Sequence, residues 1–121
     1  MKDNEIMEFV AEESKRLEID EPNIVIKKMK ASFGLADYLA WEVTLNKSWC
    51  HKSGDIIVKQ LISHELMHLR DFWIRGFSKH DRFFREMCSA YGVYLACRVS
   101  TKNKRNNIVK KIKEKENNRK V

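Results

Sequence analysis

The sequence predicts one α+β domain in which amphipathic helices and a small, mostly antiparallel sheet share a core. Three observations lead to this prediction. Apolar residues recur at helical spacing over residues 3 to 17 and again over residues 56 to 73, whereas residues 38 to 46 alternate between two faces, as a half-buried strand does. The chain has 121 residues, enough for one hydrophobic core but too few for two.

The N-terminal half is expected to form the first helix and the sheet. Pro22 follows the helix of residues 3 to 17 and cannot continue its interior. A short β-branched run at residues 24 to 30 predicts one strand, and residues 38 to 46 predict another. We expect a turn near residues 34 to 37. One face of the second strand carries Leu39, Trp41, Val43 and Leu45.

The C-terminal half is expected to be helical. The segment of residues 56 to 73 is apolar on nearly all sides, so we predict a central helix. A polar loop over residues 47 to 55 precedes it, and Asp55 is a candidate N-cap. A last long helix is predicted over residues 82 to 99, and we interpret its aromatic side chains as core that covers the site.

The central helix contains His64-Glu65-Leu66-Met67-His68, a His-Glu-x-x-His motif. Histidines four residues apart lie on one face of a helix, so both imidazoles can bind one ion. Catalytic zinc takes three protein ligands and leaves a fourth position to water. Glu65 is the candidate general base, because in this motif the carboxylate takes a proton from that water rather than binding the metal.

Two histidines remain as candidates for the third ligand. We favour His80, because the chain can turn at Gly76 and start another helix near Ser78, whose first turn would present His80 to the ion. His51 lies in a polar turn and is expected to be solvated. The motif and the donor type predict one zinc ion per chain.

Four other residues have both a functional and an ordinary structural interpretation. Asp71 and Asp81 could orient a ligating imidazole, or could be solvated surface carboxylates. Tyr91 and Tyr94 could reach a substrate oxyanion, or could be core tyrosines.

The cysteines do not indicate a disulfide framework or a zinc ribbon. Cys50, Cys88 and Cys97 are odd in number and form no Cys-x-x-Cys pair. We therefore expect free thiols and interpret Cys88 and Cys97 as core residues.

The net charge of +7 is concentrated at the C-terminal end. Residues 98 to 121 hold ten Lys/Arg and two Asp/Glu, whereas residues 1 to 21 hold three and eight. We predict a domain of residues 1 to 99 and a basic tail of residues 100 to 121 that could contact nucleic acid. No apolar run could span a membrane and the N-terminus is too acidic for a signal peptide, so we expect a cytoplasmic protein.

Over most of its length the sequence resembles the SprT-like and YgjP-like metallopeptidases of the zincin group. The resemblance implies a minimal zincin-like fold with an N-terminal helix, a small sheet, an active-site helix and a following helix that carries the third zinc ligand, here His80. Leu35-Ala36-Asp37 replaces the Ser-Cys-rich turn of that group, and the C-terminal zinc ribbon of many members is missing. The matching segments are Met29-Lys30, Phe33-Gly34, Leu45-Asn46, His64 to Leu69, and Lys79 to Phe84 as a Lys-His-x-x-x-Phe element.

These observations predict a zinc-dependent metallopeptidase. His64, His68 and His80 would hold the metal, Glu65 would activate water, and a peptide or protein substrate could lie extended beside the strand of residues 38 to 46. Two alternatives remain open: a metal-dependent hydrolase of a nucleotide or phosphate ester, and a non-catalytic binding module stabilised by zinc.

Overall fold

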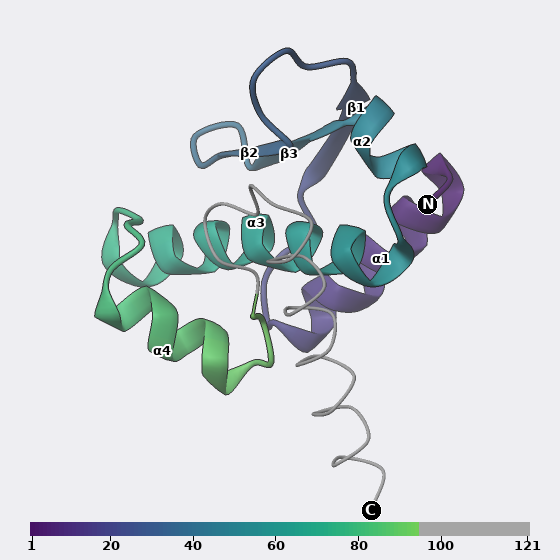
Figure 1. Cartoon of the computed structure of the whole chain (residues 1–121). Helices are drawn as coiled ribbons and strands as arrows, with labels where there is room; N and C mark the ends of the chain where they lie inside the picture. The colour runs from purple at the N-terminus through teal and green to yellow at the C-terminus, as the bar shows by residue number, and fades with distance from the viewer. Residues whose placement is uncertain (95–121) are drawn as a thin grey trace, which may run out of the picture.

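The computed structural model describes residues 1–94, in which four helices and three strands are arranged as Figure 1 shows. The α+β class predicted from the sequence is confirmed. The predicted boundary at residue 99 and the basic tail lie outside the described residues, as does Cys97. The elements are α1 (Asp3–Arg16), β1 (Asn23–Lys27), β2 (Gly34–Asp37), β3 (Glu42–Asn46), α2 (Lys47–Lys52), α3 (Asp55–Arg75) and α4 (Arg82–Ala90).

The strands form one sheet in the order β1-β3-β2, so β3 is the central strand. β2 is antiparallel to β3, as predicted, with Asp37 opposite Glu42. β1 is parallel to β3, with Asn23 opposite Glu42, and this pairing corrects the expectation of a mostly antiparallel sheet. The connection of residues 28 to 33 is long enough to cross the roughly 10 Å width of two strand spacings, so β3 fills the gap between β1 and β2.

The strand predicted over residues 38 to 46 is too long, because residues 38 to 41 form the turn between β2 and β3. The Oδ1 atom of Asp37 accepts the backbone N–H groups of Leu39 and Ala40 at 3.0 and 3.1 Å and starts this turn. Leu39 is 95% exposed, so the apolar alternation that included it did not mark a buried face. Conversely, residues 34 to 37, predicted as a turn, are strand β2.

The loop predicted over residues 47 to 55 contains the short helix α2. The Asn46 side chain caps it by accepting the N–H of Trp49, and the same side chain donates to the carbonyl oxygens of Met29 and Ser32 at 3.1 and 3.0 Å. Gly54, rather than Asp55, is the N-cap of α3. The bonds from Asn46 to Met29 and Ser32 are tertiary contacts, and the helix has only six residues, so it left no periodic signal in the sequence.

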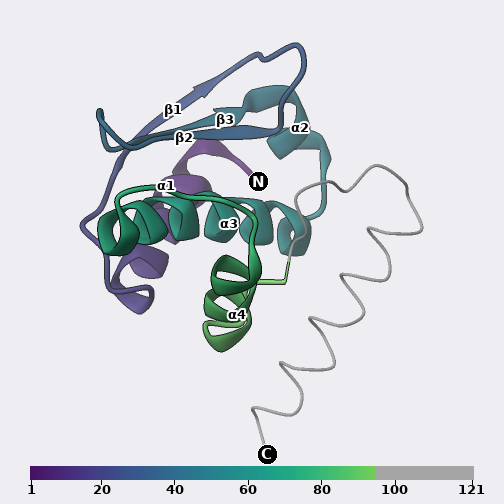
Figure 2. The same cartoon turned by 90° about the vertical axis from the view of Figure 1, so that its left-hand side faces the viewer.

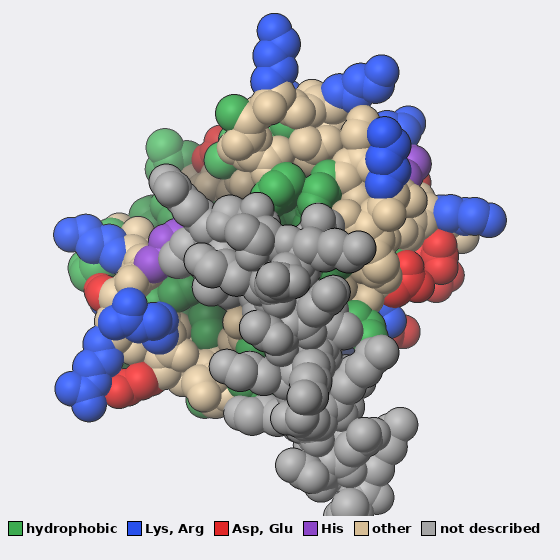
Figure 3. Space-filling view, viewed as in Figure 1, with side chains coloured by type: hydrophobic (Ala, Val, Ile, Leu, Met, Phe, Trp, Pro, Cys, Tyr) green, Lys and Arg blue, Asp and Glu red, His purple; other side chains and the backbone are tan. Residues whose placement is uncertain are grey.

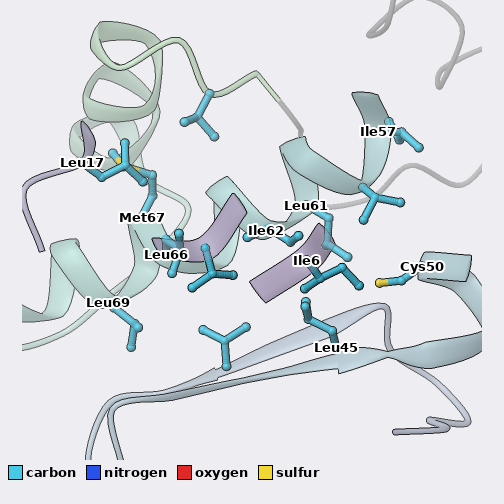
Figure 4. Packing of buried hydrophobic residues seen from close by; sticks show 14 of the residues in the cluster. Ile6, Leu17, Leu45, Cys50, Ile57, Leu61, Ile62, Leu66, Met67 and Leu69 are labelled. Atoms are coloured by element: carbon cyan, nitrogen blue, oxygen red, sulfur yellow. The ribbon is translucent and has the colours of Figure 1, made fainter. Parts of the chain in front are cut away.

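The helix α3 is central, as predicted. The sheet lies on one side of it, and α1 and α4 lie on the other (Figures 1 and 2). Figure 4 shows Ile6 of α1, Leu45 of β3 and Leu61 and Ile62 of α3 pointing into one core, and all four are buried. Polar contacts join the helices as well: Ser63 of α3 donates to Glu13 of α1, which also pairs with Arg16.

Glycines in the left-handed conformation follow the C-terminal ends of α3 and α4. α3 ends at Gly76, whose φ of 79° is the left-handed conformation that favours glycine. α4 ends at Ala90 rather than at Val99 as predicted, and Gly92 follows with a φ of 75°. Within residues 1–94, no helix is long and apolar enough to cross a membrane.

Candidate metal centre

The helix α3 holds the first two histidines of the candidate metal centre. His64 and His68 are one turn apart on one face, and their Nε2 atoms are 3.1 Å apart. His64 is 5% exposed and His68 is partly buried, so the pair is shielded from bulk water. The spacing in the sequence therefore places both imidazoles as predicted.

His80 completes a cluster of three imidazoles. Its Nε2 atom lies 3.2 Å from that of His64 and 2.8 Å from that of His68. His80 lies on the connection between α3 and α4, one residue before the N-cap Asp81, so the prediction that it occupies the first turn of a helix is corrected. Asp81 caps α4 by accepting the N–H of Phe84 at 3.1 Å, which delays the start of the helix until Arg82.

The donor set fits a tetrahedral metal ion. Among residues 1–94, the group of His64, His68 and His80 offers three nitrogen atoms that all lie within 4.8 Å of one another. Zinc–nitrogen bonds of about 2.0–2.1 Å at tetrahedral angles separate two ligand nitrogens by about 3.3 Å. The Nε2 separations of 2.8 to 3.2 Å are close to this value. In the tautomers that carry the proton on Nδ1, the three Nε2 lone pairs converge and repel one another, and a cation among them would remove this repulsion.

The surroundings favour the neutral form of His68 and of His80, which is the form that binds metal. Burial, together with the neighbouring His64 and His80, lowers the pKa of His68 to about 3, and burial also lowers the pKa of His80. The Phe84 ring stacks on the His68 ring, with centroids 4.5 Å apart. Histidine side chains reach the surface at two separate places on the face shown in Figure 3, and His51 and His80 are the two exposed histidines.

Glu65 lies next to the cluster on α3 and faces strand β2. Its side chain is only 8% exposed, and this burial raises its pKa to about 7. A carboxylate with such a pKa can take up and release a proton near neutral pH. Gly34 of β2 approaches it closely, because a Cβ atom on Gly34 would lie 3.3 Å from Cγ of Glu65.

The close approach of Gly34 predicts that Gly34→Ala displaces the Glu65 carboxylate. The added methyl group would also meet the Thr44 carbonyl oxygen at 3.4 Å, so the backbone of β3 prevents it from moving away from Glu65. We expect a loss of hydrolytic activity of about tenfold or more, with unchanged metal content. Steady-state kinetics and elemental analysis of both proteins test this, and Gly54→Ala is the control because its Cβ atom would meet nothing within 4 Å.

Residues around the cluster hold its ligands, and the sequence indicated only some of them. Ser78 contacts His68, with Oγ 2.7 Å from Nδ1, so Nδ1–H can donate there and direct the Nε2 lone pair toward the cluster. The sequence does not mark Ser78 as a residue that contacts a metal ligand. Asp71 and Asp81, which could have oriented an imidazole or been solvated surface carboxylates, both pair with Arg75. Asp71 is fully buried, so for Asp71 the solvated-surface interpretation is wrong.

Arg75 connects the helix that carries two histidines to the segment that carries the third. Its guanidinium contacts both oxygens of the fully buried Asp71 at 2.6 and 2.8 Å and both oxygens of Asp81 at 2.8 and 3.1 Å. Hydrogen bonds from Arg75 help to lower the pKa of Asp81 to about 2. Asp71 and Arg75 are four residues apart in the sequence, a spacing that is typical of an ion pair along one face of a helix.

We expect Arg75→Met to lower the melting temperature by roughly 10 °C or more, because it leaves the Asp71 carboxylate buried without its cation. Thermal unfolding followed by circular dichroism measures this change. Arg82→Met is a matched control, because it also removes an arginine that pairs with a carboxylate four residues away. That carboxylate is Glu86, and the Arg82 side chain is 89% exposed. Equal melting temperatures for the two variants would contradict the bridging role of Arg75.

The remaining candidates lie elsewhere. His51 contacts Asp3 at 2.7 Å and is not part of the cluster. The Tyr91 hydroxyl contacts Glu18 at 3.3 Å, and the backbone N–H of Tyr94 donates to Gln60 at 2.8 Å. Cys50 is a free thiol whose burial raises its pKa to about 11, and Cys88 lies in the core, as predicted.

Comparison with known proteins identifies a family and solved structures of similar fold. The sequence profile of the SprT-like family matches residues 4–106. A search of curated protein sequences found no match.

Solved structures share this fold, and two of them are metallopeptidase zymogens. The metallopeptidase zymogen jannalysin of Methanocaldococcus jannaschii is 23% identical over 95% of this chain and 93% of its own, with a TM-score of 0.66. The metallopeptidase zymogen abylysin of Pyrococcus abyssi is 18% identical over 66% of this chain and 72% of its own, with a TM-score of 0.56. This chain therefore has the fold of both proteins, in agreement with the zincin-like architecture expected from the sequence.

Proposed function

This chain belongs to the SprT-like family, and we propose that it is a zinc-dependent metallopeptidase that hydrolyses peptide bonds. One observation carries this proposal: three imidazole nitrogens converge beside a buried carboxylate. His64, His68 and His80 would hold the ion, and neutral imidazole donors suit zinc. When bound, zinc supplies a Lewis acid and lowers the pKa of water to about 7.

We assign to Glu65 the proton transfers of peptide hydrolysis. Its carboxylate would take a proton from the attacking water and give it to the nitrogen of the leaving amine. A nearby dication favours the ionised carboxylate and so lowers the pKa of Glu65 from its value of about 7 in the metal-free protein. Glu65 would therefore be ionised before reaction, as a base must be.

We propose that an extended substrate lies beside β2. The sequence had suggested the strand of residues 38 to 46, but β3 is central in the sheet and β2 is an edge strand among the described residues. Gly34 of β2 is also the residue that approaches Glu65. Main-chain hydrogen bonds to β2 would place a peptide bond of the substrate near the histidine cluster.

Metal content and peptide hydrolysis, measured on the same purified protein, test this function. We expect one zinc per chain and cleavage of an unfolded protein, which a chelator abolishes and added zinc restores. Cleavage of a phosphoanhydride without peptide hydrolysis would favour the nucleotide or phosphate ester alternative. Bound zinc without hydrolysis of either substrate would leave the non-catalytic binding module.

A further inference from the structure

A pocket lies at one end of the molecule, away from the histidine cluster. It has a volume of about 320 Å³ and is lined by Glu18, Ile19, Asp20, Trp41 and Trp73. In Figure 2 the end of α1, the turn joining β2 and β3, and the C-terminal end of α3 meet at the left. Trp73 follows His68 by five residues, which rotates it about 140° around α3, so this pocket and the histidine cluster lie on different sides of the helix.

Two tryptophans form an aromatic wall of this pocket. Trp73 is 78% exposed, although burying a tryptophan is strongly favourable. Its ring meets that of Trp41 edge to face, with centroids 6.5 Å apart. The Trp41 ring is fixed, because its Nε1–H donates to the backbone oxygen of Asp20 at 2.9 Å. The wall is therefore formed before any ligand arrives.

Two pocket residues have backbone conformations that their side chains disfavour. Glu18 and Trp41, with φ of 59° and 50°, are the two non-glycine residues of positive φ within residues 1–94. Glycine would relieve this strain at either position. Both positions instead carry side chains that line the pocket, which is the pattern expected when binding rather than stability determines the residue.

The charge around the pocket favours a cation. Glu18 and Asp20 line it, Glu21 follows directly, and residues 1 to 21 as a whole carry eight acidic and three basic residues. The nearby cation Arg70 is already engaged: it donates to the Leu17 carbonyl oxygen at 2.8 Å, lies 3.8 Å from Glu18, and stacks on Tyr91. No hydrogen bond or ion pair involves the Asp20 carboxylate within residues 1–94.

We propose that this pocket binds a lysine or arginine side chain of a separate polypeptide. The cation would lie against the tryptophan faces, where cation–π attraction is strongest, with the Asp20 and Glu18 carboxylates nearby. Such a site would let the chain select basic segments of a protein independently of the chemistry at the histidine cluster. The proposal does not depend on the proposed peptidase function.

A titration with a short peptide tests this site. The probe has blocked ends, arginine at its centre and glycine at the other four positions, and glutamine replaces the arginine in the reference peptide. We expect the indole N–H resonances of Trp41 and Trp73 to shift with the arginine peptide only, and less so as salt is raised. Mass spectrometry verifies that the peptide stays intact. No shift of these resonances with the arginine peptide would overturn the proposal.

Variants identify the groups responsible. We expect Asp20→Asn and Trp73→Leu each to weaken arginine-peptide binding about threefold or more, while Glu12→Gln, which removes an exposed charge from α1 outside the pocket, leaves binding unchanged. Because Asp20 and Trp73 are exposed, both variants should fold. Equal weakening by Glu12→Gln would attribute binding to overall charge and contradict the pocket.

Glu18→Gly separates binding from structure. Glycine suits a φ of 59°, so we expect this variant to raise the melting temperature by a few degrees and at the same time to weaken peptide binding. A purely structural role for Glu18 would not produce opposite changes in stability and affinity. Unchanged peptide affinity in Glu18→Gly would remove Glu18 from the site, and unchanged affinity in Asp20→Asn as well would overturn the electrostatic basis of the proposal.

Discussion

Glu65→Gln is expected to reduce peptide hydrolysis by about 10²- to 10⁴-fold while leaving the metal content at the wild-type value. The amide keeps the size of the side chain beside Gly34 but cannot take up the proton of the attacking water. His64, His68 and His80 are untouched, so metal binding should persist. The measurement is kcat on an unfolded protein substrate, with zinc determined by elemental analysis of the same samples.

Thermal stability distinguishes a chemical effect of this substitution from misfolding. Burial raises the pKa of Glu65 from its ordinary 4.5 to about 7, so in the metal-free wild type the folded state binds the proton more tightly than the unfolded state. Its contribution to stability therefore falls as the pH rises from about 4.5 to 7. Glutamine does not titrate, so the melting temperature of metal-free Glu65→Gln, relative to that of the metal-free wild type, should rise as the pH increases over this range.

Glu86→Gln is the matched control for activity. Glu86 lies on α4, its side chain is 65% exposed, and its partner is Arg82, so its removal should change neither kcat nor metal content. Wild-type activity in Glu65→Gln would show that Glu65 is not the base. Lost activity together with lost metal would instead assign Glu65 a role in holding the cluster.

The candidate site was more predictable than the sheet, for a physical reason. Helical geometry is local, so the four-residue spacing places His64 and His68 together wherever the helix lies. The position of His80 needed only a turn at Gly76 to return the chain. Strand pairing, in contrast, joins residues far apart in sequence, and nothing in residues 23 to 27 shows that they pair in parallel with β3.

The contacts missed by sequence reasoning are tertiary ones. Ser78 is an ordinary loop serine until the fold places its hydroxyl beside His68. Glycine is common in turns, so the sequence predicts a turn at Gly34. In the structure Gly34 lies in β2, where a side chain would press on Glu65. In both cases the residue type carries a function only through a neighbour about 10 or more positions away.

His80→Ala is expected to abolish tight zinc binding. Loss of one of three imidazole donors should weaken metal affinity by more than the roughly 10- to 100-fold that follows from losing a group that only orients a ligand. His80 is exposed and lies between helices, so its truncation should leave the core packed. Elemental analysis after dialysis against a weak chelator measures the zinc that remains, and circular dichroism verifies the fold.

His51→Ala provides the matched control because it removes the same side chain from an exposed position. His51 pairs with Asp3 and is outside the cluster, so this variant should keep one zinc per chain. If His80→Ala instead kept its zinc as well as His51→Ala does, two imidazoles and some group other than His80 would hold the ion. The short Nε2 separations of His80 from His64 and His68 would then reflect packing alone.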